Sequence, residues 1–406
     1  MVRAVNSAGD AVVDTPLGVV LAAGALPGEE LSLHGIRREG RVMRGQMGEI
    51  ERPSPERVTP SCPHASSCGG CPLAIASPPL ERRIKRELLE RALEGFEDRP
   101  ELLWVAAPSS EGYRTRARMH FSAGRLGYRV RRGRGLVDIA LCELLVPSLG
   151  QALSCLREGV MPLLRGQGQV ALALGDAGAV ITLETGQSQT SALYSALEAL
   201  ADEPGVAGVA ARIGGTAAAR FGHPEPVLEG ADGASLRVPR GGFAQAQQAV
   251  NTRLVRYVAA QAQPAGQRVL ELYAGAGNLS VLLAKGAASF ESVESSPEAV
   301  EAARDNLRAR GLAGKLVCGS AEDLAAGGAV DVLVLDPPRE GALRALAPAL
   351  KRRPKRIVYV SCQPSTLGRD LAVLRGAGFQ LVALAAFDMF PQTAHIESVV
   401  SLERMP

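Results

Sequence analysis

Cys362 lies where a reactive thiol would be useful. It follows an apolar run at residues 356–361, which has the composition of a buried strand, and it precedes a helical segment at 366–375. The positive end of a helix lowers the pKa of a nearby thiol and makes the nucleophilic thiolate more available. The alternative is an inert buried cysteine, which is common for this residue type and is what we expect of Cys155 and Cys318.

Glu397 is a second residue that could take part in chemistry. No helix separates the strand-like runs at residues 380–387 and 395–402, so we expect the two runs to pair as a hairpin. If that hairpin lies beside the sheet, the Glu397 carboxylate returns to the same edge as Cys362, where it could act as a base. A charge that protects an edge strand from aggregation is the alternative.

A glycine-rich turn follows another short apolar run and suits a bound cofactor. Gly275 and Gly277 allow the tight turn that ligand sites need at the carboxyl end of a strand. Glu294 ends the next run, where its carboxylate could take the ribose hydroxyls of NAD or of S-adenosylmethionine, and Asp336 ends a later run. Ser280 replaces the third glycine of the dinucleotide fingerprint, which favours S-adenosylmethionine because that molecule has no pyrophosphate. An ordinary strand–turn–helix is the alternative.

Four of the seven cysteines have a spacing typical of metal ligands. Five residues separate Cys62 from Cys68, two separate Cys68 from Cys71, and Cys142 follows 71 positions later. An odd number of cysteines, in a chain that starts without a recognisable export signal, argues against a disulfide framework. Four thiolates could hold either a zinc ion or an iron–sulfur cluster, and spacing alone does not decide between the two.

Short apolar runs alternate with helical segments from about residue 240 onward, and they must position these side chains. Such alternation is the signature of a doubly wound parallel sheet, and it predicts an α/β domain over residues 239–406. We expect strands at residues 268–273, 290–294, 315–319, 331–336 and 356–361, and helices at 297–310 and 366–375.

The preceding residues predict two further domains. Residues 1–57 contain short strand-like runs between Gly and Pro turns, which fits a small β-barrel. Residues 58–238 combine the cysteines, a charged helical stretch and an arginine-rich stretch, so we expect a central α+β domain. Arginine interleaved with aromatic side chains suits contacts with RNA, although an ordinary exposed hairpin has the same composition. The arginines of that stretch are Arg114, Arg116, Arg118, Arg125, Arg129, Arg131, Arg132 and Arg134.

Composition narrows the classes of protein without identifying a partner. The chain has 406 residues, a hydrophobic content of 46% and a formal net charge of +3, which is too small to indicate a nucleic-acid ligand by itself. Five of the 45 basic residues are lysine, and a GC-rich genome explains this arginine bias as readily as phosphate binding does. No run reaches the roughly 18–20 apolar residues of a membrane helix, so we expect a cytoplasmic protein with no membrane partner and no obligate protein partner.

Four sequence blocks resemble the RNA 5-methyluridine methyltransferases. They are Glu-Leu-Tyr-Ala-Gly-Ala-Gly-Asn at 271–278, Leu-Asp-Pro-Pro-Arg at 335–339, Tyr-Val-Ser-Cys-Gln-Pro-Ser-Thr-Leu-Gly-Arg-Asp at 359–370 and Asp-Met-Phe-Pro-Gln-Thr-Ala-His-Ile-Glu at 388–397. The last two blocks are specific to that family, and the match extends over nearly the whole chain. The resemblance implies a C-terminal Rossmann-like class I methyltransferase domain, a central iron–sulfur domain and an N-terminal TRAM domain, which is a small RNA-binding barrel of the oligonucleotide-binding (OB) type.

The resemblance also implies roles for individual residues. Cys362 matches the family's nucleophile, Glu397 matches its general base, and the four spaced cysteines match the ligands of a four-iron, four-sulfur cluster, [4Fe-4S]. Members with this cluster and a TRAM domain are typically bacterial enzymes that act on 23S ribosomal RNA (rRNA), which favours 23S rRNA over tRNA as the substrate. The positions that match active-site or S-adenosylmethionine contacts are Gln245, Tyr273, Asn278, Glu294 and Asp336.

Two departures from the family pattern leave both catalytic positions intact. Gln247 stands where the family usually has Asn, and Gln363 follows Cys362 where Asn is commoner. Two other classes stay open: a redox enzyme that uses NAD and an iron–sulfur centre, and a non-catalytic RNA-binding protein with a methyltransferase fold. The missing third glycine argues against the first class, and the retained Cys362 and Glu397 argue against the second.

Overall fold

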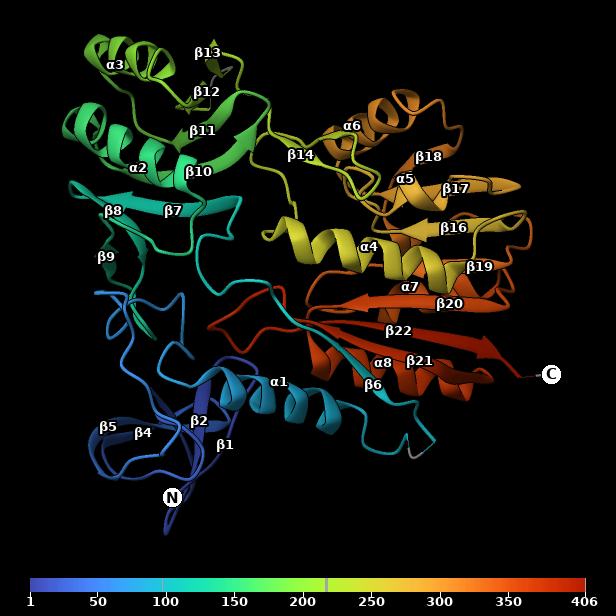
Figure 1. Cartoon of the computed structure of the whole chain (residues 1–406), viewed down its shortest axis with the longest axis horizontal. Helices are drawn as coiled ribbons and strands as arrows, with labels where there is room; N and C mark the ends of the chain where they lie inside the picture. The colour runs from blue at the N-terminus through green and yellow to red at the C-terminus, as the bar shows by residue number, and fades with distance from the viewer. Residues whose placement is uncertain (97, 216–217, 406) are drawn as a thin grey trace.

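The structure is a computed structural model that describes residues 1–96, 98–215 and 218–405, and these residues form three larger sheets and one two-stranded sheet (Figure 1). The C-terminal sheet has five neighbouring parallel strands, followed by β22, which runs antiparallel between β20 and β21. This arrangement confirms the predicted hairpin at the end of the sequence. In spatial order the strands are β18 (Lys315–Cys318), β17 (Ser289–Glu294), β16 (Arg268–Leu272), β19 (Val332–Leu335), β20 (Arg356–Ser361), β22 (Glu397–Arg404), β21 (Phe379–Phe387) and β6 (Leu102–Val105).

Helices cover both faces of the C-terminal sheet, which is why its strands are apolar on both sides. Leu270 and Leu272 of β16 pack on one face, whereas Val269 packs on the other. No helix in the described part of the chain is long and apolar enough to cross a membrane. The helices on the first face are α1 (Pro78–Ala92), α7 (Leu343–Leu350) and α8 (Pro364–Gly376), and those on the second are α4 (Gln248–Ala262), α5 (Ser280–Leu283) and α6 (Pro297–Arg308).

The eighth strand of this sheet comes from a distant part of the chain. Strand β6 pairs in parallel with β21, and α1 packs against α8. Leu89 and Leu93, at the C-terminal end of α1, enter the core of the C-terminal sheet. Both segments precede residue 239, so the chain contributes to the C-terminal body from two separate stretches of sequence.

The middle of the chain forms a seven-stranded sheet against which α2 (Pro147–Gly159) and α3 (Ser191–Ala201) pack. Its strands are antiparallel except for the β11–β12 pair. The two-stranded sheet of β14 (Val227–Glu229) and β15 (Ser235–Arg237) follows, and β15 packs on α6. The order of the seven strands is β13 (Ala219–Gly222), β12 (Val206–Ile213), β11 (Gly178–Thr185), β10 (Gln167–Gly175), β7 (Arg116–Ser122), β8 (Arg125–Arg129) and β9 (Leu136–Asp138).

The N-terminal residues form a five-stranded sheet whose two ends lie close together. The Val2 N–H donates to the Glu29 carbonyl (2.8 Å), and the Gly28 N–H donates to the Val2 carbonyl (2.9 Å), so the first strand contacts the residues just before β4. The strands, in spatial order, are β1 (Val2–Val5), β2 (Asp10–Thr15), β3 (Gly18–Ala23), β5 (Val42–Arg52) and β4 (Glu30–Glu39).

Helix α1 joins the N-terminal sheet to the C-terminal sheet, as Figure 1 shows. Leu80 and Ile84 of α1 share a small apolar core with Val5 and Leu26 of the N-terminal segment. Ala394, in the loop between β21 and β22, belongs to the same core. One helix therefore contacts the first and the last parts of the chain.

Candidate active site and cysteine cluster

Cys362 and Glu397 meet at the carboxyl end of β20. Cys362 follows β20 directly and lies just before α8, as the sequence predicted. Strands β20 and β22 pair antiparallel with Ser361 opposite Ser398, so the next pair in this register is Cys362 and Glu397. Glu397 is buried, with 3% of its surface exposed, and Cys362 is partly buried. The final hairpin therefore brings a thiol and a carboxylate together.

The charges next to this pair are mainly negative. Burial raises the pKa of the Cys362 thiol to about 12, the carboxylates of Glu397 and Asp336 add to this effect, and Arg339 opposes it. The sequence predicted that the start of α8 would lower the pKa of this thiol. That prediction is wrong, because burial and the two carboxylates make the net shift upward. Burial also raises the pKa of Glu397 to about 8, with a contribution from Asp336. Burial alone raises the pKa of Asp336 to about 7.

Arg339 is a cation of this site that the sequence did not lead us to expect as a site residue. Its Nη2 lies 3.3 Å from Nε2 of His395. Burial lowers the pKa of His395 to about 4 and Arg339 contributes to this lowering, so the imidazole is neutral and can accept a hydrogen bond from Arg339. The available signal was its position in the Asp-Pro-Pro-Arg block, three residues after Asp336 at a strand end.

The glycine turn after β16 and the acidic end of β17 lie at the same edge of the sheet. Gly275 and Gly277 have φ angles of +55° and +89°, which glycine adopts without strain. Glu294 is held in place because its Oε2 accepts from the Gly275 N–H (2.9 Å) and its Oε1 accepts from the Ser296 N–H (2.8 Å). The Cβ position of residue 275 borders open space. Glu294 therefore presents a fixed carboxylate beside open backbone at this edge of the sheet.

Ser280, at the place of the missing third glycine, supports a buried carboxylate. Its hydroxyl donates to Oε2 of Glu271 (2.5 Å), which lies within β16 directly below the turn. Burial raises the pKa of Glu271 to about 8, and the carboxylates of Asp336 and Glu294 contribute. The serine therefore has a structural use that a glycine could not provide.

Tyr273, Asn278 and Gln245 differ in how their surroundings hold them. Tyr273 has a φ of +65°, which is an uncommon left-handed conformation for a bulky residue, and burial raises the pKa of its hydroxyl to about 12. Asn278 exchanges two side-chain hydrogen bonds with Asn251 of α4 (2.9 and 3.0 Å). Gln245 is buried, and its Oε1 has no hydrogen-bond partner among the described residues. A buried polar atom of this kind calls for a ligand or water as its partner.

The four cysteines with metal-like spacing come together. Cys62, Cys68 and Cys71 lie in the segment before α1, and Cys142 lies between β9 and α2. A thiolate at Cys142 raises the pKa of each of the other three thiols, so the four side chains are neighbours. All four are free thiols. In this structure, no group of three or more His, Cys, Asp or Glu side chains among the described residues is arranged to hold a metal ion.

Positive charge and N–H groups surround these cysteines. The Gly70 N–H lies 3.4 Å from Sγ of Cys68. Arg131 donates to the Cys71 carbonyl (3.4 Å), and its charge favours the Cys68 thiolate. Burial raises the pKa of the Cys71 thiol to about 12, and Arg114 opposes this rise. Cations and N–H donors of this kind stabilise thiolates that bind a metal or a cluster.

Part of the arginine-rich stretch is used inside the protein. Arg132 pairs with Asp10 of the N-terminal sheet (2.5 Å), and Arg116 donates to the Ala244 carbonyl (2.9 Å). Arginines that form such internal contacts are not free to bind RNA, so the predicted RNA contact applies only to the other members of the stretch. The exposed members that do not border the cysteines or pair with Asp10 include Arg125 and Arg134.

The C-terminal sheet has the Rossmann-like methyltransferase fold, in which an antiparallel hairpin completes a parallel sheet and ligands bind at the carboxyl ends of the strands. Comparison with solved structures supports this class. The chain is similar to the tRNA (uracil-54, C5)-methyltransferase of Pyrococcus abyssi, solved with S-adenosyl-L-homocysteine, with a TM-score of 0.79 and 23% sequence identity. The match covers 99% of each chain.

Sequence comparison identifies the family. Residues 327–405 match the tRNA (Uracil-5-)-methyltransferase family model, and residues 236–350 match the methyltransferase small domain. The 23S rRNA (uracil(1939)-C(5))-methyltransferase RlmD of Klebsiella pneumoniae is 32% identical over 400 residues, covering 95% of this chain and 91% of that protein. The RlmD of Halomonas elongata is 37% identical over 416 residues, covering 95% and 84%. The chain belongs to the family of RNA uracil-C5 methyltransferases.

Proposed function

We propose that this chain transfers a methyl group from S-adenosylmethionine to carbon 5 of a uridine in RNA, with Cys362 as the covalent nucleophile and Glu397 as the general base. The observation that carries the proposal is that these two residues lie opposite each other, next to the last pair of β20 and β22, at the carboxyl ends of the parallel strands. A nucleophile beside a basic carboxylate suits a reaction that needs covalent attack and a later proton removal. The relatives described above are named for the same reaction.

Cys362 makes carbon 5 reactive. Carbon 5 of uracil is a poor nucleophile, and addition of the Cys362 thiolate at carbon 6 breaks the 5,6 double bond and forms an enolate with electron density on carbon 5. S-adenosylmethionine, when bound, supplies the electrophilic methyl group. Because the pKa of the Cys362 thiol is raised to about 12, the free enzyme holds mainly the thiol at neutral pH, and the thiol proton must leave to solvent as the bond to carbon 6 forms.

Glu397 completes the reaction by removing the proton from carbon 5 after methylation. The electrons of that C–H bond re-form the 5,6 double bond, and the carbon–sulfur bond breaks to release Cys362. The pKa of Glu397, raised to about 8 by burial, lies near the range that suits a general base. We assign Gln245 to the uracil ring, because its unpartnered Oε1 can accept a hydrogen bond from the ring N3–H and its amide N–H can stabilise the enolate oxygen.

We assign the S-adenosylmethionine site to the carboxyl ends of β16, β17 and β19. Glu294 would accept hydrogen bonds from the ribose hydroxyls, and the backbone of Gly275 would lie against the bound molecule. Tyr273 and Asn278 flank the same turn, and Asp336 ends β19 beside Cys362.

We infer that Cys62, Cys68, Cys71 and Cys142 hold a [4Fe–4S] cluster. Their mutual interaction and the nearby arginines support this inference, because four thiolates around a cluster concentrate negative charge. With all four cysteines used as ligands, no iron would be open for chemistry, so the cluster would stabilise the region before α1.

We propose 23S rRNA as the substrate, because the relatives that cover nearly the whole chain are named for it. The N-terminal sheet would act as a TRAM-type RNA-binding module, and an enzyme of this kind would meet its substrate in the cytoplasm. The second candidate is tRNA, because the structural neighbour of similar length is a tRNA enzyme. The testing experiment compares methylation of protein-free 23S rRNA and unmodified tRNA by one enzyme preparation. Methylation of 23S rRNA is expected, and methylation of tRNA alone would contradict the substrate assignment.

A further inference from the structure

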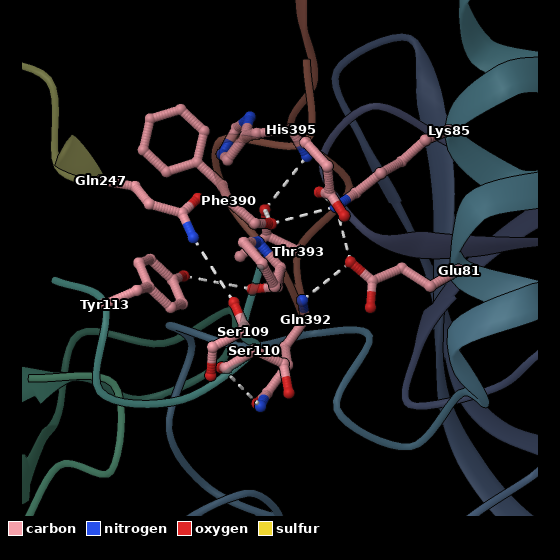
Figure 2. Close-up of polar contacts among 12 residues, drawn as sticks. Glu81, Lys85, Ser109, Ser110, Tyr113, Gln247, Phe390, Gln392, Thr393 and His395 are labelled. Carbon is pink, nitrogen blue, oxygen red and sulfur yellow. Dashed lines mark hydrogen bonds and ion pairs between the residues drawn. The ribbon is translucent and has the colours of Figure 1, made fainter. Parts of the chain in front are cut away.

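The loop between β21 and β22 leads directly into Glu397, and it is held by groups from outside the C-terminal sequence. Figure 2 shows side chains on both sides of this loop: Glu81 and Lys85 come from α1, and Tyr113 and Gln247 approach from the opposite side. Phe387 pairs with Glu397 across the hairpin, so the start of the loop lies next to the proposed base. The position of the loop therefore affects the position of Glu397.

Lys85 is the centre of the contacts on the α1 side. It is fully buried, and its Nζ has three acceptors: Oε1 of Glu81 (2.5 Å), Oδ1 of Asp388 (2.6 Å) and the Phe390 carbonyl (3.1 Å). An ammonium group has three donors, so each N–H has one acceptor. Two of the three acceptors belong to the loop. A buried lysine with complete hydrogen bonding fixes the geometry of the groups around it.

Glu81 extends this network further along the loop. The same Oε1 that accepts from Lys85 also accepts from the Gln392 N–H (2.8 Å). Gln392 has a φ of +65°, a conformation that a non-glycine residue adopts only when its surroundings hold it there. One lysine and one glutamate of α1 thus hold both the start and the middle of the loop.

The opposite side of the loop is fixed as well. The Tyr113 hydroxyl donates to the Pro391 carbonyl (3.3 Å). In the amide orientation that satisfies both of its polar atoms, Gln247 donates to the carbonyls of Asp388 (3.1 Å) and Met389 (3.0 Å). The loop therefore has little freedom to move on this side, and Lys85 provides the charged contact on the other.

We propose that Lys85 is a positioning residue for Glu397, which it holds in register through Asp388 and the loop. This inference rests on the proposed role of Glu397 as the general base. Loss of the Lys85 cation would leave the buried Glu81 carboxylate and the partly buried Asp388 carboxylate beside each other without their partner, and the loop would shift to reduce their repulsion. Proton removal from carbon 5 would slow more than methyl transfer, because Cys362 is held separately by β20 and α8.

The test measures single-turnover methylation of protein-free 23S rRNA with radiolabelled S-adenosylmethionine, followed by denaturing gels. The measured quantity is the ratio of label in the protein–RNA adduct to label in free RNA. We expect Lys85→Met to raise this ratio roughly tenfold, as loss of a supporting contact to a functional residue typically does. A purely structural role would lower the amount of folded enzyme without changing this ratio. Arg86→Met, which removes an exposed neighbour on the same helix, should behave as wild type.

Glu397→Gln separates failure of this inference from failure of the proposed function. If Glu397→Gln traps the adduct and Lys85→Met has the wild-type ratio, Lys85 is not a positioning residue and the role of Glu397 stands. If Glu397→Gln itself traps nothing, the general-base role is wrong and the inference falls with it. Should Lys85→Met fail to fold, Asp388→Ala removes the charged link to the loop and keeps the Lys85–Glu81 pair. A wild-type ratio in Asp388→Ala would equally overturn the inference.

Discussion

Cys362 and Cys71 are two partly buried cysteines whose surroundings differ. Burial is the main reason that the pKa of each thiol is raised to about 12. Around Cys362 the next influences are the carboxylates of Glu397 and Asp336, whereas around Cys71 they are a guanidinium group and three other thiols. Burial alone therefore does not distinguish a reactive cysteine from a ligand cysteine.

The neighbours explain the two proposed uses. Carboxylates beside Cys362 disfavour its thiolate until a substrate changes the site, and one of them can serve as a base. Thiols gathered near arginine favour shared negative charge, which a metal cluster neutralises. Substitution of Cys362 should therefore abolish methylation and leave cluster binding intact. Substitution of Cys71 should abolish cluster binding and leave the nucleophile intact.

The largest effect is expected for Cys362→Ala. Loss of the nucleophile should lower methylation by roughly three orders of magnitude or more, because no other group can activate carbon 5. Binding of S-adenosylmethionine, measured by calorimetry, and iron content should stay at wild-type values. Cys318 is exposed rather than buried as expected, and it pairs with Glu294 of the proposed cofactor site, so Cys155→Ala of α2 is the matched control. Near-normal turnover in Cys362→Ala would disprove the covalent mechanism.

The pH profile tests the carboxylate side of the comparison. Glu397 acts as a base only when ionised, and burial raises its pKa to about 8. Decay of the methylated adduct, which is the step assigned to Glu397, should therefore speed up as the pH increases through about 8 and slow about tenfold per unit below that value. Arg339 lowers the pKa of both Cys362 and Glu397, so Arg339→Gln should move the profile to higher pH. A profile that Arg339→Gln leaves unchanged would contradict this account of the charges.

The cysteine cluster is tested by comparing Cys71→Ser with Cys155→Ser. Anaerobically purified wild-type protein should contain about four irons per chain. Cys71→Ser should lose iron and lower the free energy of unfolding by roughly 2–4 kcal/mol, because the segment before α1 loses its cross-link. Cys155 interacts with Glu203 and Glu158 rather than with the other thiols, so Cys155→Ser should keep its iron. Stoichiometric zinc in the wild-type protein would refute the cluster assignment.

The smallest effect is expected from replacing exposed arginines that lie beside neither Cys362 nor the four clustered cysteines. Arg125 and Arg134 are exposed on or beside the β8–β9 hairpin. Replacing both by Ala should weaken RNA binding at low salt and reduce the dependence of log K on log salt by about one unit per lost phosphate contact. Arg344→Ala, at an exposed arginine of α7, is the control. An unchanged salt dependence in the double variant would remove this hairpin from the RNA interface.

The regular parts of the molecule were predictable from the sequence. Apolar runs with helical segments between them predicted the five parallel strands, and the ends of these strands gather Cys362, Glu294 and Asp336 at one edge. Local patterns could not indicate that β6 pairs with β21 or that α1 packs beside it, because nothing in a four-residue strand identifies so distant a partner. Lys85 was equally hidden, because nothing in the sequence shows which of the five lysines is buried. Likewise, the sign of the Cys362 pKa shift depends on burial, which the sequence does not give.

The contact between Lys85 and Asp388 joins residues 303 positions apart, and this distance has a consequence for biosynthesis. A ribosome adding about 5–20 residues per second needs roughly 15–60 s to travel from one to the other. During that interval α1 and β6 have been made, but β21, with which β6 will pair, and α8, against which α1 will pack, do not exist. Leu89 and Leu93 at the end of α1 and the backbone of β6 must then stay uncovered, or be bound by a chaperone, until the last strands emerge. The nascent chain can bury this charge pair only when its synthesis is nearly complete.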